Sequence, residues 1–99
     1  MSATVGNARI TLYFEDTFSL KDKRGEMKRL TSRISKQFNC AIAEIEDLDD
    51  IRVGTLGVLV LSTSADHASQ MLNRIIAEIE RLLELSTFGD VSTELFPYD

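Results

Sequence analysis

The sequence has 99 residues, 43% of them hydrophobic and 27% charged, with a formal net charge of −5 at pH 7. This composition is ordinary for a globular protein and excludes an intrinsically disordered chain, and the length predicts a single domain over residues 1–99. No stretch approaches the roughly 20 apolar residues that cross a bilayer, and residues 1–7 lack the basic start and apolar run of a secretory signal, which together predict a cytoplasmic protein without a membrane partner.

The first half of the chain predicts a strand, a helix and a second strand. From Ala8 to Phe14, residues of one face alternate with residues of the other at the two-residue period of a half-buried strand. Ser19 followed by Asp22 has the spacing of a capping box, so we expect an amphipathic helix from Leu20 to about Phe38. The short apolar segment from Cys40 to Ile45 then predicts a second strand.

The middle of the chain predicts a buried strand and a second helix. The segment from Leu56 to Leu61 is apolar at every position except Gly57, so we expect a central strand that is covered on both faces. Thr63 with Asp66 repeats the capping-box spacing, and the strongly amphipathic stretch that follows predicts a second helix to Leu83.

The end of the chain predicts a fourth strand. After an expected turn from Ser86 to Asp90, the alternation of Val91, Thr93 and Leu95 before Pro97 indicates an edge strand. Right-handed crossovers place both helices of this strand-helix-strand-strand-helix-strand order on the same face of one sheet. We therefore predict an α+β, ferredoxin-like βαββαβ sandwich with a four-stranded antiparallel sheet of order 4-1-3-2.

The first helix is the most basic part of the chain. Residues 21–36 hold seven bases and two acids, a net charge of +5, which leaves −10 on the remainder. At about 100° per residue, five of these bases form a continuous flank beside the apolar stripe. These candidate nucleic-acid-binding residues are Lys21, Arg24, Lys28, Arg29 and Lys36. The flank fits RNA phosphates or an acidic protein, and a solvated helix face attracted to the acidic remainder is the alternative.

Lys23 is the one base of this helix that falls within the apolar arc. We expect its stem to lie along the core while its ammonium reaches solvent, or pairs with Glu15 or Asp16. Gly25 indicates either close packing at this position or a tolerated exposed glycine.

No set of residues in the sequence has the spacing of a catalytic or metal site. Cys40 and His67 are the only cysteine and histidine and cannot supply a four-ligand zinc site. We expect Cys40 to be a small buried hydrophobe and His67 a surface residue without a neighbouring nucleophile or carboxylate. The sequence therefore predicts a noncatalytic protein with no cofactor and no metal.

An acidic stretch follows the second predicted strand. It consists of Glu44, Glu46, Asp47, Asp49 and Asp50. Their spacing lacks the framework of an EF-hand loop, so a solvated turn, or a docking partner for another subunit's basic helix, is the better interpretation.

The face of the sheet away from the helices carries the second candidate surface. Leu56, Val58 and Val60 point to one side of the predicted third strand and Leu59 and Leu61 to the other, while the helices can cover only one side. The sequence leaves open which side is uncovered. Exposed apolar patches mark interfaces, so Tyr13, Leu59 and Leu61 are the candidate interface of a homodimer that forms face to face or edge to edge, with two-fold symmetry.

One segment and three shorter pieces occur in a fixed order along the chain: Ser19-Leu20-Lys21-Asp22-Lys23-Arg24, then Phe38-Asn39, Ala43-Glu44-Ile45 and Leu56-Gly57. In these residues, and over roughly Ala8 to Leu95, the chain resembles the YlxP-like family of small bacterial proteins. It implies a ferredoxin-like fold and no established activity. Many members are encoded beside translation initiation and ribosome-maturation factors, which implies an RNA or ribosome partner by association alone.

One loop departs from the family pattern. Members often have Asp-Leu-Trp-Gln-Arg where this chain has Asp49-Asp50-Ile51-Arg52-Val53, so the tryptophan and the final arginine are absent. If that loop carries the family's function, this chain has altered or lost it.

The sequence leaves two main functional interpretations open. The first is a noncatalytic binding or assembly module, a homodimer whose basic helix contacts RNA, with the ribosome as a candidate partner. The alternative is a dimeric sensor that binds a small metabolite at the sheet interface, and an unrecognised enzyme is a third.

Overall fold

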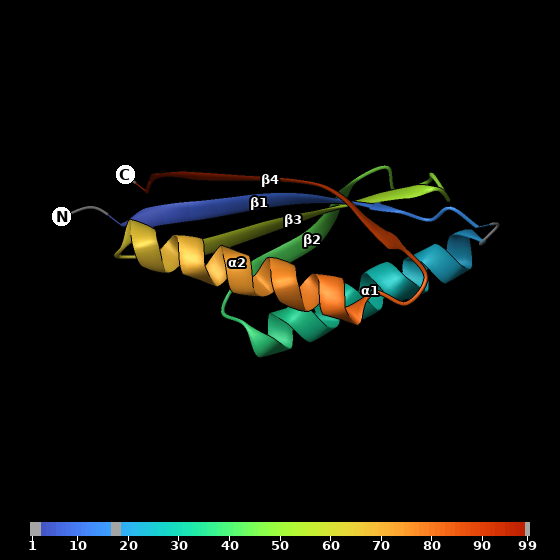
Figure 1. Cartoon of the computed structure of the whole chain (residues 1–99), viewed down its shortest axis with the longest axis horizontal. Coiled ribbons are helices and arrows are strands. Elements are labelled where there is room, and N and C mark those ends of the chain that lie inside the picture. The colour runs from blue at the N-terminus through green and yellow to red at the C-terminus, as the bar shows by residue number, and fades with distance from the viewer. Residues whose placement is uncertain (1–2, 17–18, 99) are drawn as a thin grey trace.

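The computed structural model describes residues 3–16 and 19–98 and shows one antiparallel sheet with two helices. Its elements are β1 (Thr4–Tyr13), α1 (Leu20–Gln37), β2 (Ala41–Glu46), β3 (Val53–Ser62), α2 (Ala65–Leu82) and β4 (Thr87–Pro97). The strand order β2-β3-β1-β4 is the predicted order 4-1-3-2 read from the opposite edge. Both helices lie on the same side of the sheet (Figure 1), so the predicted fold class is confirmed.

The start of α1 follows directly from its capping box. The N–H of Asp22 donates to Ser19 Oγ at 3.0 Å, and the N–H of Ser19 donates to Asp22 Oδ2 at 3.3 Å. These bonds satisfy backbone donors that the first helical turn leaves free, so the helix begins at Leu20 as predicted. It ends at Gln37, one residue before the predicted end.

The predicted cap of α2 is wrong by one residue. Ser64, not Thr63, is the N-cap, and its Oγ accepts the N–H of His67 at 3.3 Å. Because α2 begins at Ala65, the third helical residue is His67, and Asp66 lies in the first turn without closing a box with Thr63.

The predicted turn from Ser86 to Asp90 is also wrong, because β4 already begins at Thr87. A side chain at Gly89 would collide with the Tyr13 ring and the Thr11 carbonyl oxygen, so glycine serves close approach to β1 here. The pairing of β1 with β4 shifts its register between Ile10 and Leu12, which accommodates this close approach. The edge position of β4 is confirmed.

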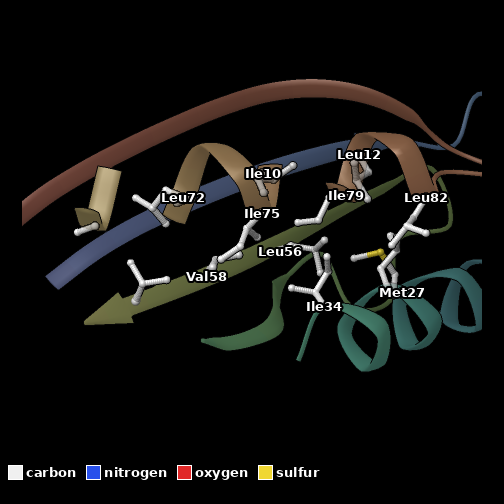
Figure 2. Packing of buried hydrophobic residues seen from close by; sticks show 14 of the residues in the cluster. Ile10, Leu12, Met27, Ile34, Leu56, Val58, Leu72, Ile75, Ile79 and Leu82 are labelled. Atoms are coloured by element: carbon white, nitrogen blue, oxygen red, sulfur yellow. The ribbon is translucent and has the colours of Figure 1, made fainter. Parts of the chain in front are cut away.

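The core fills the space between the sheet and the two helices. Figure 2 shows Ile10 and Leu12 of β1, and Leu56 and Val58 of β3, beside the apolar residues of α2. The helices contribute Met27, Leu30, Ile34, Ala68, Leu72, Ile75, Ile79 and Leu82. The alternation predicted for β1 is confirmed, since Ala8, Ile10 and Leu12 are buried. The expectation that β3 is covered on both faces is wrong for the single chain: Leu56, Val58 and Val60 are buried under the helices, but Leu59 and Leu61 are exposed on the other face. Neither helix of the described chain combines the length and hydropathy needed to cross a membrane.

Candidate functional site

The structure divides the bases of α1 into internal and exposed groups, and Lys23 belongs to the first. Lys23 is fully buried, and its ammonium donates to the carbonyl oxygens of Asp47 at 2.5 Å and Asp50 at 2.7 Å. Its Nζ also lies 3.2 Å from Glu44 Oε2. The expectation that Lys23 reaches solvent or pairs with Glu15 or Asp16 is therefore wrong, because the loop between β2 and β3 covers the first turn of α1.

The acidic stretch is folded to present its backbone to Lys23. Asp47 has a positive φ of 62°, a conformation that aspartate tolerates better than most residues, and its Oδ2 accepts the hydroxyl of Thr55 at 3.1 Å. The N–H of Asp50 donates to the carbonyl of Asp47 at 3.1 Å, which closes the turn. Arg24 Nη2 lies 3.4 Å from Asp49 Oδ1. The acidic loop thus docks on the basic helix of its own chain.

Two further charged residues of α1 form hydrogen bonds with the end of α2 and with the segment that follows it. The carboxylate of Glu26 is buried and accepts the N–H groups of Glu84, Leu85 and Ser86 at 2.8–3.1 Å, and the Ser86 hydroxyl at 2.5 Å. Burial alone would raise the pKa of Glu26, but the hydrogen bond from the Ser86 hydroxyl and those from the three N–H groups outweigh burial and lower it. Arg29 Nη2 donates to the Leu82 carbonyl at 2.6 Å.

The role of Glu26 was missed in the sequence, although a signal existed. At about 100° per residue, Glu26 lies beside Leu30 at the border of the apolar arc. A carboxylate there loses hydration and needs hydrogen-bond donors from the protein. The donors lie 58 to 60 residues away in sequence, so only the tertiary fold identifies them.

The other predicted bases of α1 stay at the surface. Lys21, Arg24, Lys28 and Lys36 are exposed, whereas the Arg29 side chain is only 26% exposed and serves the internal contact. We name the four exposed residues the basic flank. Gly25 meets no neighbouring atom within 4 Å, so it is a tolerated exposed glycine.

The basic flank borders a shallow groove along the edge strand β2. Arg24 and Lys28 line one wall of this groove of about 330 Å³, and Ile42 and Ala43 line the other. The structure therefore brings two of the predicted bases to a concave surface beside an unpaired strand edge.

The three residues predicted for a dimer interface share one face but not one patch. Leu59 and Leu61 are 47% and 54% exposed on the side of β3 that faces away from the helices. Tyr13 is on the same face, but eight residues of β1 at about 3.3 Å each separate it from Val5, the partner of Leu61, by roughly 26 Å. An Arg9–Glu46 ion pair lies on the face between them.

His67 has a neighbour that the sequence did not reveal. Its Nδ1 lies 2.9 Å from Ser62 Oγ, and the same oxygen accepts the N–H of Ser64. Ser62 ends β3 and His67 lies in the first turn of α2, so the contact joins the two elements next to the N-cap Ser64. The pair corrects the expectation that no nucleophile-type residue lies beside His67.

Cys40 packs against the core just before β2 and is partly buried. Burial raises the pKa of its thiol, which lowers the thiolate fraction at neutral pH. Among the described residues, no three of the histidine, cysteine and acidic side chains are grouped to hold a metal ion.

Comparison with known sequences places the chain in a family. The family described as "Protein of unknown function (DUF503)" matches residues 5–89. The chain belongs to the DUF503 family. One DUF503 relative is the "Uncharacterized protein YlxP" of Bacillus subtilis (strain 168), 31% identical over 81 residues, which are 82% of this chain and 88% of the relative. The predicted resemblance to YlxP-like proteins is confirmed.

Solved structures with the same architecture confirm the fold of this DUF503 member. The de novo designed protein Foldit4 matches with a TM-score of 0.55 and 18% identity, covering 95% of this chain and 96% of that chain. The structural genomics protein YJCS matches with a TM-score of 0.54 and 11% identity, covering 91% and 96%. At such identities the likeness is one of fold alone.

Proposed function

We propose that this protein is a noncatalytic binding module that contacts the phosphate backbone of RNA through the basic flank of α1. One observation carries the proposal. Once Lys23 and Arg29 are engaged inside the molecule, five of the seven bases of residues 21–36 remain exposed. Four of these five form the basic flank, on one side of a single helix of an acidic protein. In the described part of the chain, Arg24 is the one flank residue with an ion pair, and that pair is between exposed side chains.

The charge distribution favours a partner that carries many negative charges. Residues 21–36 carry +5 and the remainder −10, so a polyanion is attracted at the flank and repelled elsewhere. From Lys21 to Lys36 the helix rises about 22 Å, at about 1.5 Å per residue, which is long enough to face several phosphates. Binding of this kind is largely independent of base sequence and strongly salt-dependent.

The noncatalytic part of the proposal is supported by the surroundings of His67. The Ser62 hydroxyl is already used by the N–H of Ser64, and the pair is exposed at a helix start. In the described residues no carboxylate is hydrogen-bonded to the other ring nitrogen of His67, so the arrangement lacks the third group of a nucleophilic triad.

Replacing Lys28 by glutamate is expected to weaken binding to a fluorescein-labelled single-stranded RNA roughly tenfold at low salt, because a contact to phosphate becomes a repulsion. Fluorescence anisotropy across a salt series measures the affinity. The matched control is Arg74→Glu, which makes the same charge change at an exposed position of α2. Equal losses in the two variants would mean that net charge, not the flank, governs binding. Arg29→Glu is unsuitable here because it would also release the end of α2.

Replacing Asp49 by asparagine is expected to tighten RNA binding about twofold. The change removes the carboxylate that lies 3.4 Å from Arg24 and leaves the loop carbonyls that hold Lys23 unchanged. The same anisotropy assay measures it, with Glu80→Gln on α2 as the control for removing one negative charge. An unchanged affinity for Asp49→Asn would place Arg24 outside the contact.

We propose further that the protein forms a homodimer through the open face of its sheet. Leu59 and Leu61 are exposed there although they belong to the apolar run from Leu56 to Leu61, and a second copy would supply the cover that the sequence predicted for both faces of this strand. Dimerisation would also double the number of basic flanks, which strengthens binding to a long polyanion.

A small-ligand sensor is the second candidate function, favoured by an apolar hollow on the same face. The hollow of about 320 Å³ is lined by Ala41, Ala43, Ile45 and Gly57, among others. A thermal-shift screen with a metabolite panel separates the candidates, because a bound ligand raises the unfolding temperature in proportion to its affinity and concentration.

A further inference from the structure

We infer that the free edge of β2 and the neighbouring wall of α1 bind an extended acidic segment of another protein, which adds to the sheet as a fifth strand. The interaction surface consists of the edge of β2 (Ala41–Glu46) together with Arg24, Lys28 and Thr31 of α1. We name this surface the β2 groove. The inference goes beyond the proposed RNA contact, because it concerns a protein partner and depends on backbone pairing as well as on charge.

The edge of β2 has unpaired backbone groups. Within the described chain β2 has one neighbour in the sheet, β3. The pairing with β3 is regular from Ala41 to Glu44, where every second residue directs its N–H and C=O away from β3. β2 contains neither lysine nor proline, two residues that commonly prevent further pairing at an edge. A row of donors and acceptors is therefore available to a further strand.

α1 forms the second wall of the β2 groove and packs against β2 on the helix-covered side of the sheet (Figure 1). The groove of about 330 Å³ is lined by Ile42, Ala43 and Glu44 of β2 and by Arg24, Met27, Lys28 and Thr31 of α1. A strand added about 4.8 Å beyond β2 directs every second side chain towards α1. Such a groove suits an extended peptide, which is bound through its main chain and recognised through alternate side chains.

Arg24 and Lys28 are spaced for acidic residues at every second position of the added strand. Four residues of a helix rise about 6 Å, and two residues of a strand rise about 6.6 Å. Both bases are exposed, and among the described residues Arg24 has one ion pair, with the exposed Asp49 at 3.4 Å, while Lys28 has none. The partner therefore has acidic side chains at positions i and i+2, and the residues between them point to the open face beside Ala41 and Ala43.

The two carboxylates of β2 do not oppose such a partner. Glu44 Oε2 lies 3.2 Å from the ammonium nitrogen of the buried Lys23, and Glu46 forms an ion pair with Arg9. The other edge strand of the sheet, β4, contains two acidic residues and no basic one. Charge therefore directs an acidic strand to β2 rather than to β4.

Fluorescence anisotropy with the full chain and a fluorescein-labelled peptide tests the inference. The peptide has about eight residues, enough to span β2, and alternates glutamate with valine. The matched peptide has the same composition but repeats Glu-Glu-Val-Val, so that glutamates on one face lie about 13 Å apart and cannot meet both bases. The alternating peptide should bind about fivefold more tightly, since it keeps a second ion pair. Equal affinities would overturn the inferred spacing.

Lys28→Glu should weaken binding of the alternating peptide about fivefold, because an attraction becomes a repulsion. Arg74→Glu makes the same charge change at an exposed position of α2 and should change the affinity less than about twofold. Urea unfolding of both variants checks that the fold is retained. Equal losses in the two variants would show that the peptide does not bind in the β2 groove.

Methylation of the peptide nitrogens separates strand addition from attraction by charge alone. Only every second residue of an added strand donates its N–H to β2. Of two alternating peptides, one N-methylated at the valines and one at the glutamates, one should lose about tenfold in affinity and the other less than about twofold. Equal effects of the two modifications would overturn strand addition.

The outcomes also separate the inference from the proposed RNA contact and from self-association. RNA binding without any peptide binding at about 500 µM protein overturns the inference alone. Peptide binding without RNA binding supports the inference and contradicts the RNA proposal. Sedimentation equilibrium with and without the alternating peptide tests a second copy as the occupant. A dimer that the peptide dissociates would overturn the inference, because the edge of β2 then pairs with a second copy of the chain.

Discussion

Glu26→Gln is expected to lower the free energy of unfolding by about 3 kcal/mol at pH 7. The buried carboxylate accepts the N–H groups of residues 84–86 and the Ser86 hydroxyl, and hydrogen bonds to a charged group contribute about 1.5–3 kcal/mol each. Glutamine keeps the size of the side chain, but its NH₂ group would face donors. Urea unfolding followed by circular dichroism measures the loss.

The same variant has a distinctive pH dependence. Because the folded protein lowers the pKa of Glu26, the unfolded chain binds the proton more tightly, and the stabilisation is complete above the unfolded value of about 4.5. It is lost as the pH falls through the folded pKa. The difference in stability between wild type and Glu26→Gln should therefore shrink on acidification.

Glu84→Gln is the matched control, since its side chain is 70% exposed and lies 3.8 Å from Arg29. It should change stability by less than about 0.5 kcal/mol, as surface pairs do. A loss for Glu26→Gln no larger than that of Glu84→Gln would show that the carboxylate does not hold the end of α2.

Lys23→Met is expected to cost about 3 kcal/mol of stability. Methionine replaces the buried apolar stem, so the loss is confined to the ammonium and its two carbonyl partners, together with the uncompensated charge of Glu44. Lys28→Met makes the same change at an exposed position of the same helix and should be nearly neutral.

Two further readouts show whether Lys23 acts through the loop. Amide hydrogen exchange should accelerate in residues 47–52 of Lys23→Met, because the loop loses its anchor. Adding Glu44→Gln to Lys23→Met should recover part of the loss, since the second change removes the unpaired buried charge. Unchanged loop exchange together with full stability would contradict the buried contact.

The pattern of hydrophobic residues was sufficient to predict the architecture, because the residues that define each strand or helix are close together in the sequence. The alternation from Ala8 to Phe14 defines a strand and its buried face, whereas the apolar run from Leu56 to Leu61 defines a central strand but not which of its faces the helices cover. The Ser19 box likewise acts within four residues, and its prediction is confirmed. The start of α2 was predicted one residue too early, since Thr63 and Ser64 are both good capping residues and only the path of the chain selects Ser64.

The internal roles of charged residues could not be predicted in this way. The carbonyl partners of Lys23 lie 24 and 27 residues away and belong to backbone, which carries no sequence signal. Likewise, the start of β4 at Thr87 depends on Glu26 holding Ser86 rather than on turn residues. A helical wheel groups Arg29 with the basic flank. Only its hydrogen bond to the Leu82 carbonyl in the folded protein shows that Arg29 faces inward.

These contacts give the family-like segment from Ser19 to Arg24 a structural explanation. Ser19 and Asp22 cap α1, Lys23 anchors the acidic loop, and Arg24 reaches Asp49 on that loop. Ser19, Asp22 and Lys23 of this segment therefore serve architecture, while its Lys21 and Arg24 also belong to the basic flank. The functional proposal depends instead on exposed bases such as Lys28 and Lys36, for which the structure provides no internal partner among the described residues.

The central claim is that Lys23 acts inside the molecule while exposed bases such as Lys28 contact RNA. The slope of log affinity against log salt for RNA binding tests this claim most directly. Wild type, Lys28→Gln and Lys23→Met are compared under conditions in which all three are folded. An exposed phosphate contact contributes roughly 0.7 to the slope on single-stranded RNA, so Lys28→Gln should lower it by about that amount. Lys23→Met should keep the wild-type slope, because its ammonium is buried against the loop. A slope that falls for Lys23→Met but not for Lys28→Gln, or a wild-type protein that does not bind RNA at low salt, would contradict the account.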